Sequence, residues 1–129
     1  MPVYVTDYAK AARRTWAAAE ALPKTCQAVK GYLYGIAAEC AVKACMRRAG
    51  LTELAEDRRN DPYFAHYPYL ANQLKERIVG RGQSDLARYA QTTFLQDWNT
   101  DMRYSDGSQI TSHMVSKWRD AADRAVADV

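Results

Sequence analysis

The chain has 129 residues, of which 48% are apolar and 26% charged, and its formal net charge is +3. This composition excludes a disordered tail, a collagen-like chain and a disulfide-stapled miniprotein, because the apolar side chains suffice for one core. The charge is too small for a protein that coats DNA, and the basic excess lies in the first half of the chain. We expect a single domain spanning residues 1–129.

Apolar residues recur at helical spacing in five segments. The first helix is expected over about residues 6–22, and the second, the most regular, over about residues 24–49 with Gly50 as its stop. Gly31 and Gly35 lie inside the second segment, where each costs about 1 kcal/mol relative to Ala. They are either tolerated or mark close packing against another helix or chain.

The second half of the chain predicts three further helices. Residues 51–65 carry a charged run and an Asp-Pro step, which predict a loop with a short turn. The helices are expected over 68–79, from Gln83 or Ser84 to the break at 105–108, and from Thr111 or Ser112 to the C-terminus. No segment alternates like a hairpin, so the expected fold is all-α, an antiparallel up-and-down bundle of four to five helices.

From its targeting and cysteine patterns we expect the protein in the cytoplasm, away from membranes. The N-terminal segment has no apolar core of signal-peptide length, and no run of about 18 apolar residues occurs in the chain. The three cysteines, Cys26, Cys40 and Cys45, are odd in number and lack the spacing of metal ligands. We expect buried free thiols, no metal site and no cofactor.

Two groups of polar and aromatic residues stand out, because phosphate-binding glycine loops, paired-histidine metal motifs and nucleophile elbows are all missing. Glu39 and Lys43 are four residues apart in the second helix and share a face with Tyr32, either as a structural pair or as part of a ligand site.

The other group, Trp98 with the run 101–104, ends the fourth predicted helix. Its Arg103 either caps that helix or lies beside aromatic surface, where it would suit a phosphate or a nucleobase.

These groups carry a resemblance to a known family. The run 32–44, His66 with Leu70 and Leu74, and Trp98 with the run 102–105 resemble, in order and spacing, the HEPN family of small helical bundles. The resemblance implies a bundle of four or five helices that often forms a homodimer. It also implies a role beside a nucleotidyltransferase-type partner in toxin–antitoxin or defence modules, where many members are metal-independent ribonucleases.

The ribonuclease members carry an arginine followed after four to six residues by a histidine near the end of a late helix. Arg103 matches that arginine, but the next histidine is His113, so the chain departs from the catalytic pattern. Arg59 and His66 satisfy the spacing, but they precede the third helix. There His66 matches a structural position at the entry of that helix, and His113 is expected near the N-terminal cap of the last helix.

We therefore expect a HEPN-like, non-catalytic nucleotide- or RNA-binding accessory protein that forms a homodimer. The residues expected at the ligand are Arg103, Tyr104, Trp98, Glu39, Lys43 and Tyr32. The alternative is a metal-independent ribonuclease toxin in which Arg103 works with an atypically placed His113 or His66. A second alternative is a structural protein-interaction subunit, which the nine tyrosines would also suit.

Overall fold

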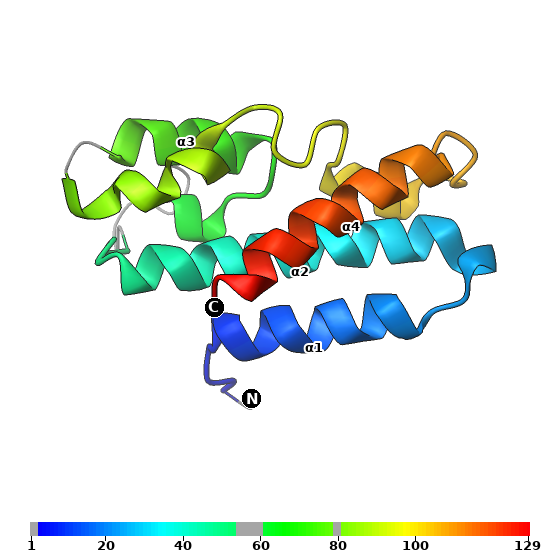
Figure 1. Cartoon of the computed structure of the whole chain (residues 1–129), viewed down its shortest axis with the longest axis horizontal. Helices are drawn as coiled ribbons and strands as arrows, with labels where there is room; N and C mark the ends of the chain where they lie inside the picture. The colour runs from blue at the N-terminus through cyan, green and yellow to red at the C-terminus, as the bar shows by residue number, and fades with distance from the viewer. Residues whose placement is uncertain (1–2, 54–60, 79–80) are drawn as a thin grey trace.

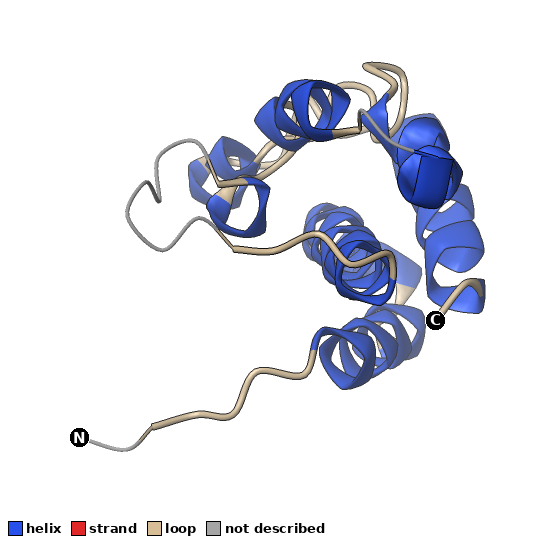
Figure 2. Cartoon of the chain, turned by 90° about the vertical axis from the view of Figure 1, so that its left-hand side faces the viewer, coloured by secondary structure: helices blue, strands red, loops and turns tan. Residues whose placement is uncertain are grey.

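The computed structural model describes residues 3–53, 61–78 and 81–129. Regular structure in this part of the chain is entirely helical (Figures 1 and 2), which confirms the predicted all-α bundle of four to five helices. The α-helices are α1 (Tyr8–Ala21), α2 (Gln27–Arg48), α3 (Tyr69–Arg77) and α4 (Ser112–Ala127). The 3-10 helices are η1 (Lys24–Cys26), η3 (Pro62–Phe64), η4 (Arg81–Ala90) and η5 (Thr100–Tyr104).

Helices α1, α2 and α4 form the body of the molecule (Figure 1). Helix α1 is antiparallel to α2 and also to α4, where Trp16 Nε1 donates to Asp123 at 2.6 Å and Arg119 pairs with Glu20 at 2.8 Å. Helix α4 runs in the same direction as α2. This direction follows from the segment before α4, which returns to the start of α2, where the Gln27 amide donates to the carbonyl of Ile110 at 2.9 Å. The up-and-down order therefore holds for α1 and α2, whereas α4 lies parallel to α2.

Helix starts follow local side-chain chemistry. The Asp7 carboxylate accepts a hydrogen bond from the backbone N–H of Lys10 at 3.0 Å, and the Thr111 hydroxyl accepts one from Met114 at 3.1 Å. Both side chains satisfy backbone donors that have no partner inside the helix. The predicted cap of the last helix is confirmed, and Pro68 lies just before the first turn of α3.

The predicted fourth helix is wrong as one continuous element. The 3-10 helix η4 ends at Ala90, and η5 begins only at Thr100. Between them Leu95 and Asp97 have positive φ angles of 54° and 69°, in the left-handed region that ends a right-handed helix. The break turns Trp98 inward, where its Nε1 donates to the carbonyl of Gly31 in α2 at 3.2 Å.

Four buried tyrosines keep their hydroxyl groups hydrogen-bonded inside the bundle. Tyr34 donates to Glu20, Tyr63 to the carbonyl of Leu51, Tyr67 to that of Tyr89, and Tyr89 to Asp128. Burial raises the pKa of all four hydroxyls above its ordinary value near 10, and that of Tyr63 to about 12.

We expect the free energy of unfolding to fall as the pH rises above about 10. The unfolded chain releases its tyrosine protons near pH 10, whereas the folded chain still holds that of Tyr63 up to about pH 12, so the folded state binds more protons in this window. Denaturant titrations at about pH 9 and 11 should show a loss of roughly 1 kcal/mol for each such tyrosine. Tyr63→Phe should reduce the loss; an equal loss in both proteins would contradict the assignment.

Candidate functional site

One stripe of α2 carries the polar residues that the sequence singled out. Tyr32, Glu39 and Lys43 follow one another at intervals of seven and four residues, which places them on the same side of the helix. Glu39 and Lys43 are only 3% and 7% exposed, so both are buried charged side chains rather than a solvated surface pair. Burial lowers the pKa of Lys43, while the charges of Glu39 and Asp61 act in the opposite direction.

The buried Glu39 carboxylate holds the loop that leads into α3. It accepts hydrogen bonds from the backbone N–H of Tyr67 at 2.7 Å and from Nδ1 of His66 at 2.9 Å. Asp61, also fully buried, fixes the other end of this loop by accepting from the backbone N–H of Tyr63 at 3.0 Å. Glu39 therefore anchors residues 66–67 to α2, whereas the Asp61 hydrogen bond is local to the loop.

This anchoring fixes the chemistry of His66, whose side chain is 50% exposed. Because an ionised carboxylate only accepts hydrogen bonds, the ring nitrogen that faces Glu39 carries the proton. In the neutral ring Nε2 is then an acceptor on the side away from Glu39. A histidine oriented in this way can accept a hydrogen bond or a proton from a bound molecule.

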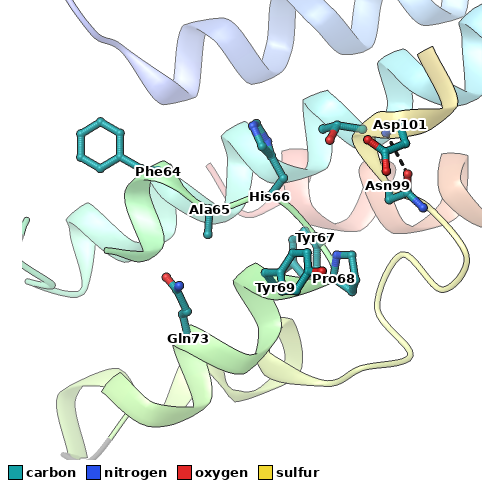
Figure 3. Close-up of a pocket in the computed structure, with 10 residues that line it drawn as sticks. Phe64, Ala65, His66, Tyr67, Pro68, Tyr69, Gln73, Asn99 and Asp101 are labelled. Atoms are coloured by element: carbon teal, nitrogen blue, oxygen red, sulfur yellow. Dashed lines mark hydrogen bonds between the residues drawn. The ribbon is translucent and has the colours of Figure 1, made fainter. Parts of the chain in front are cut away.

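His66 lines a cleft with a volume of about 520 Å³ (Figure 3). Its walls come from the segment before α3, from α3 itself and from the start of η5: Phe64, Ala65, His66, Tyr67, Pro68, Tyr69, Gln73, Asn99, Thr100 and Asp101. The amide oxygen of Asn99 accepts from the backbone N–H of Asp101 at 2.8 Å and thereby starts η5. The volume is in the range of small-molecule sites.

A second cluster lies at the end of η5 and combines four of the expected ligand residues. The Tyr32 ring stacks on Trp98 with centroids 5.8 Å apart and an angle of 17° between the ring planes. The Arg103 guanidinium donates to the Tyr32 hydroxyl at 3.4 Å and lies 4.7 Å from the centre of the Tyr104 ring. Trp98 is 1% exposed, so it supports Tyr32 from below and has no surface for a ligand.

The cleft and this cluster adjoin each other through η5. Thr100 and Asp101 line the cleft, and Arg103 follows two residues after Asp101 in the same short helix. Because a 3-10 helix rises about 2 Å per residue, the two positions are about 4 Å apart along its axis. The cleft with His66 and the cluster with Arg103 are thus linked through η5, although Arg103 itself does not line the cleft.

The remaining predicted residues lie elsewhere. His113 is exposed in the first turn of α4 and lines neither the cleft nor the Arg103 cluster. Arg59 lies outside the described residues. Cys45 is buried as expected, whereas Cys26 and Cys40 are only partly buried.

Sequence reasoning missed the cleft walls, above all Phe64, Tyr69 and Asn99. The aromatic run around His66 was the available signal, because large aromatic side chains next to Pro and His are unusual in a solvated loop.

The part of the chain that the structure describes contains neither a metal-ligand cluster nor a membrane-spanning helix. There, no three His, Cys, Asp or Glu side chains converge as metal ligands would. None of the described helices is both long and apolar enough to span a bilayer.

No family model, curated protein or solved structure matches this chain. The chemistry of the site is therefore inferred from its own geometry.

Proposed function

We propose that the chain is a HEPN-like, non-catalytic accessory protein that binds a nucleotide or RNA, with Arg103 and Tyr104 on the phosphate and the base. We also propose that it works as a homodimer in a toxin–antitoxin or defence module, beside a nucleotidyltransferase-type partner. The observation that carries the binding proposal is the position of the Arg103 guanidinium. It contacts the Tyr32 hydroxyl and the Tyr104 ring, and no carboxylate among the described residues neutralises its charge.

The surroundings of the Arg103 guanidinium support this proposal. It lies on the Tyr32 hydroxyl and the Tyr104 ring, and no carboxylate among the described residues pairs with it. A free guanidinium fork matches two phosphate oxygens. Its orientation is set by Tyr32, which in turn is fixed by the stack on Trp98, so less side-chain entropy is lost when a phosphate binds.

Tyr104 supplies the second element of such a site. Its ring is 78% exposed, and one face already carries the Arg103 guanidinium. Aromatic side chains beside cationic groups are the recurrent platform for bases of single-stranded nucleic acid. Glu39 and Lys43 are buried, so their role in the proposed site is to position the α2 face and the His66 loop.

We expect Arg103→Ala to weaken the binding of a labelled single-stranded RNA oligonucleotide by about tenfold or more, because a charge-assisted phosphate contact is lost. Fluorescence anisotropy at several salt concentrations measures this loss, and the salt slope should fall by about one. Arg103→Lys should retain part of the affinity, since it keeps the charge but loses the fork.

Arg13→Ala is the matched control, because Arg13 is exposed on α1 and has no part in the cluster. Equal affinities of wild type and Arg103→Ala for RNA and for nucleotides, with unchanged melting temperatures, would refute the binding proposal.

A second candidate function, a metal-independent ribonuclease, is favoured by one observation, the Glu39–His66 pair beside the cleft. A histidine held by a carboxylate could remove the proton of a ribose 2′-hydroxyl. Incubation of RNA with chelator and with wild type, His66→Ala or His113→Ala distinguishes the two functions. Cleavage by wild type that is lost in His66→Ala would replace the binding proposal with this enzyme.

A further inference from the structure

The cleft beside η5 presents hydrogen-bond acceptors to a ligand. One is Nε2 of His66 whenever the ring is neutral with its Nδ1–H on Glu39. The other is the carboxylate of Asp101, an exposed residue in the first turn of η5. In Figure 3 the Asp101 carboxylate and the His66 ring lie along the same side of the cleft. A ligand that fits here offers hydrogen-bond donors along one edge.

The cleft also presents two exposed aromatic rings. Phe64 and Tyr69 line it and are 45% and 72% exposed, although large aromatic side chains are normally covered in a protein of this size. The Tyr69 ring offers a flat apolar face to a flat partner. The described lining therefore combines aromatic surface with a polar edge, as sites for planar heterocycles do.

We propose that this cleft holds the base of the bound nucleotide or RNA and selects guanine. The inference rests on the proposed function, because it takes the ligand to be a nucleotide whose phosphate lies on Arg103. Asp101 and Arg103 are two residues apart in η5, so a ligand with its base at Asp101 has a phosphate-binding side chain within the same short helix.

The donor and acceptor pattern of the bases leads to guanine. Its Watson–Crick edge carries two adjacent donors, the ring N1–H and the exocyclic amino group, which match the two oxygens of one carboxylate. Uracil places carbonyl oxygens on both sides of its single N–H, and these are repelled by a carboxylate. Adenine and cytosine each pair an amino group with a ring acceptor on this edge, so they satisfy Asp101 through one donor only.

The test is isothermal titration calorimetry of the protein with GMP, AMP, CMP and UMP. The titrations are done at about pH 8, where an ordinary imidazole is neutral. Wild type should bind GMP about tenfold more tightly than the other three, the usual value of one bidentate contact. Asp101→Asn should lower the affinity for GMP about tenfold and abolish the preference. Asp120→Asn, which removes an exposed carboxylate on α4, should behave like wild type.

Two further arms separate this inference from the proposed function. If Arg103→Ala weakens the binding of all four nucleotides but wild type shows no preference among them, the phosphate site stands and guanine selection is wrong. If guanosine, which has no phosphate, binds more tightly than adenosine while Arg103→Ala changes nothing, the base cleft stands and the phosphate site is wrong. A preference for GMP that survives in Asp101→Asn, or no binding of any nucleotide, overturns the inference.

Discussion

Gly35→Ala is expected to destabilise the protein by at least about 3 kcal/mol, the largest effect among the glycines that the structure describes. A Cβ at this position would overlap Cε2 and Nε1 of Trp98 far inside van der Waals contact. The indole cannot move aside easily, because it is 1% exposed, stacks on Tyr32 and donates to the carbonyl of Gly31. Chemical denaturation followed by circular dichroism measures the loss.

Two comparisons show whether Trp98 is the cause. Gly31→Ala should cost less, because the added Cβ would lie 2.9 Å from the Trp118 ring, a smaller overlap. In a Trp98→Leu background, Gly35→Ala should cost much less than in wild type, because the group that it strikes is gone. Equal costs of Gly35→Ala in both backgrounds would show that the Cβ does not meet Trp98.

Glu39→Ala is expected to cost about 3–5 kcal/mol, because it removes a buried carboxylate whose charge offsets that of buried Lys43. Lys43 would remain buried without this charge, and the backbone N–H of Tyr67 would lose its acceptor. Glu53→Ala is the surface control: Glu53 also pairs with a basic residue, Arg47, but at 46% exposure, so its loss should cost less than about 1 kcal/mol.

The pH dependence of Glu39→Ala follows from Lys43. Burial lowers the pKa of Lys43 in the folded state, so the unfolded chain binds more protons at this group. The free energy of unfolding therefore rises, through Lys43, as the pH rises toward about 10. This rise should be larger in Glu39→Ala than in wild type, and Glu39→Ala/Lys43→Met should not show it. A loss below about 1 kcal/mol that is independent of pH would contradict the buried pair.

The sequence patterns predicted α1, α2 and α4 well, because their apolar spacing and capping residues act locally. The same reasoning failed between Ala90 and Thr100, where the period of apolar residues continues but the backbone turns left-handed at Leu95 and Asp97. There the burial of Trp98 against α2 overrides local helix propensity. The glycines of α2 were a true signal of close packing, although each faces a tryptophan rather than a helix backbone.

The candidate site was predictable only in part. Arg103 and Tyr104 lie together, as their neighbouring positions indicated, whereas the contact of Arg103 with Tyr32 joins residues 71 positions apart and follows from the tertiary fold. The contact of His66 with Glu39 spans 27 residues and depends on how a loop folds back, which no periodicity reveals. Phe64 and Asp101 meet in one cleft for the same reason.

The parallel arrangement of α2 and α4 has a consequence for the order of folding. Helices α1 and α2 are neighbours in sequence and can pair as soon as both exist, whereas the contact of Trp16 with Asp123 joins residues 107 positions apart. During synthesis the Gly31 side of α2 therefore waits for Trp118 until α4 has been made. A chain that stops before α4 leaves this closely packed surface of α2 exposed.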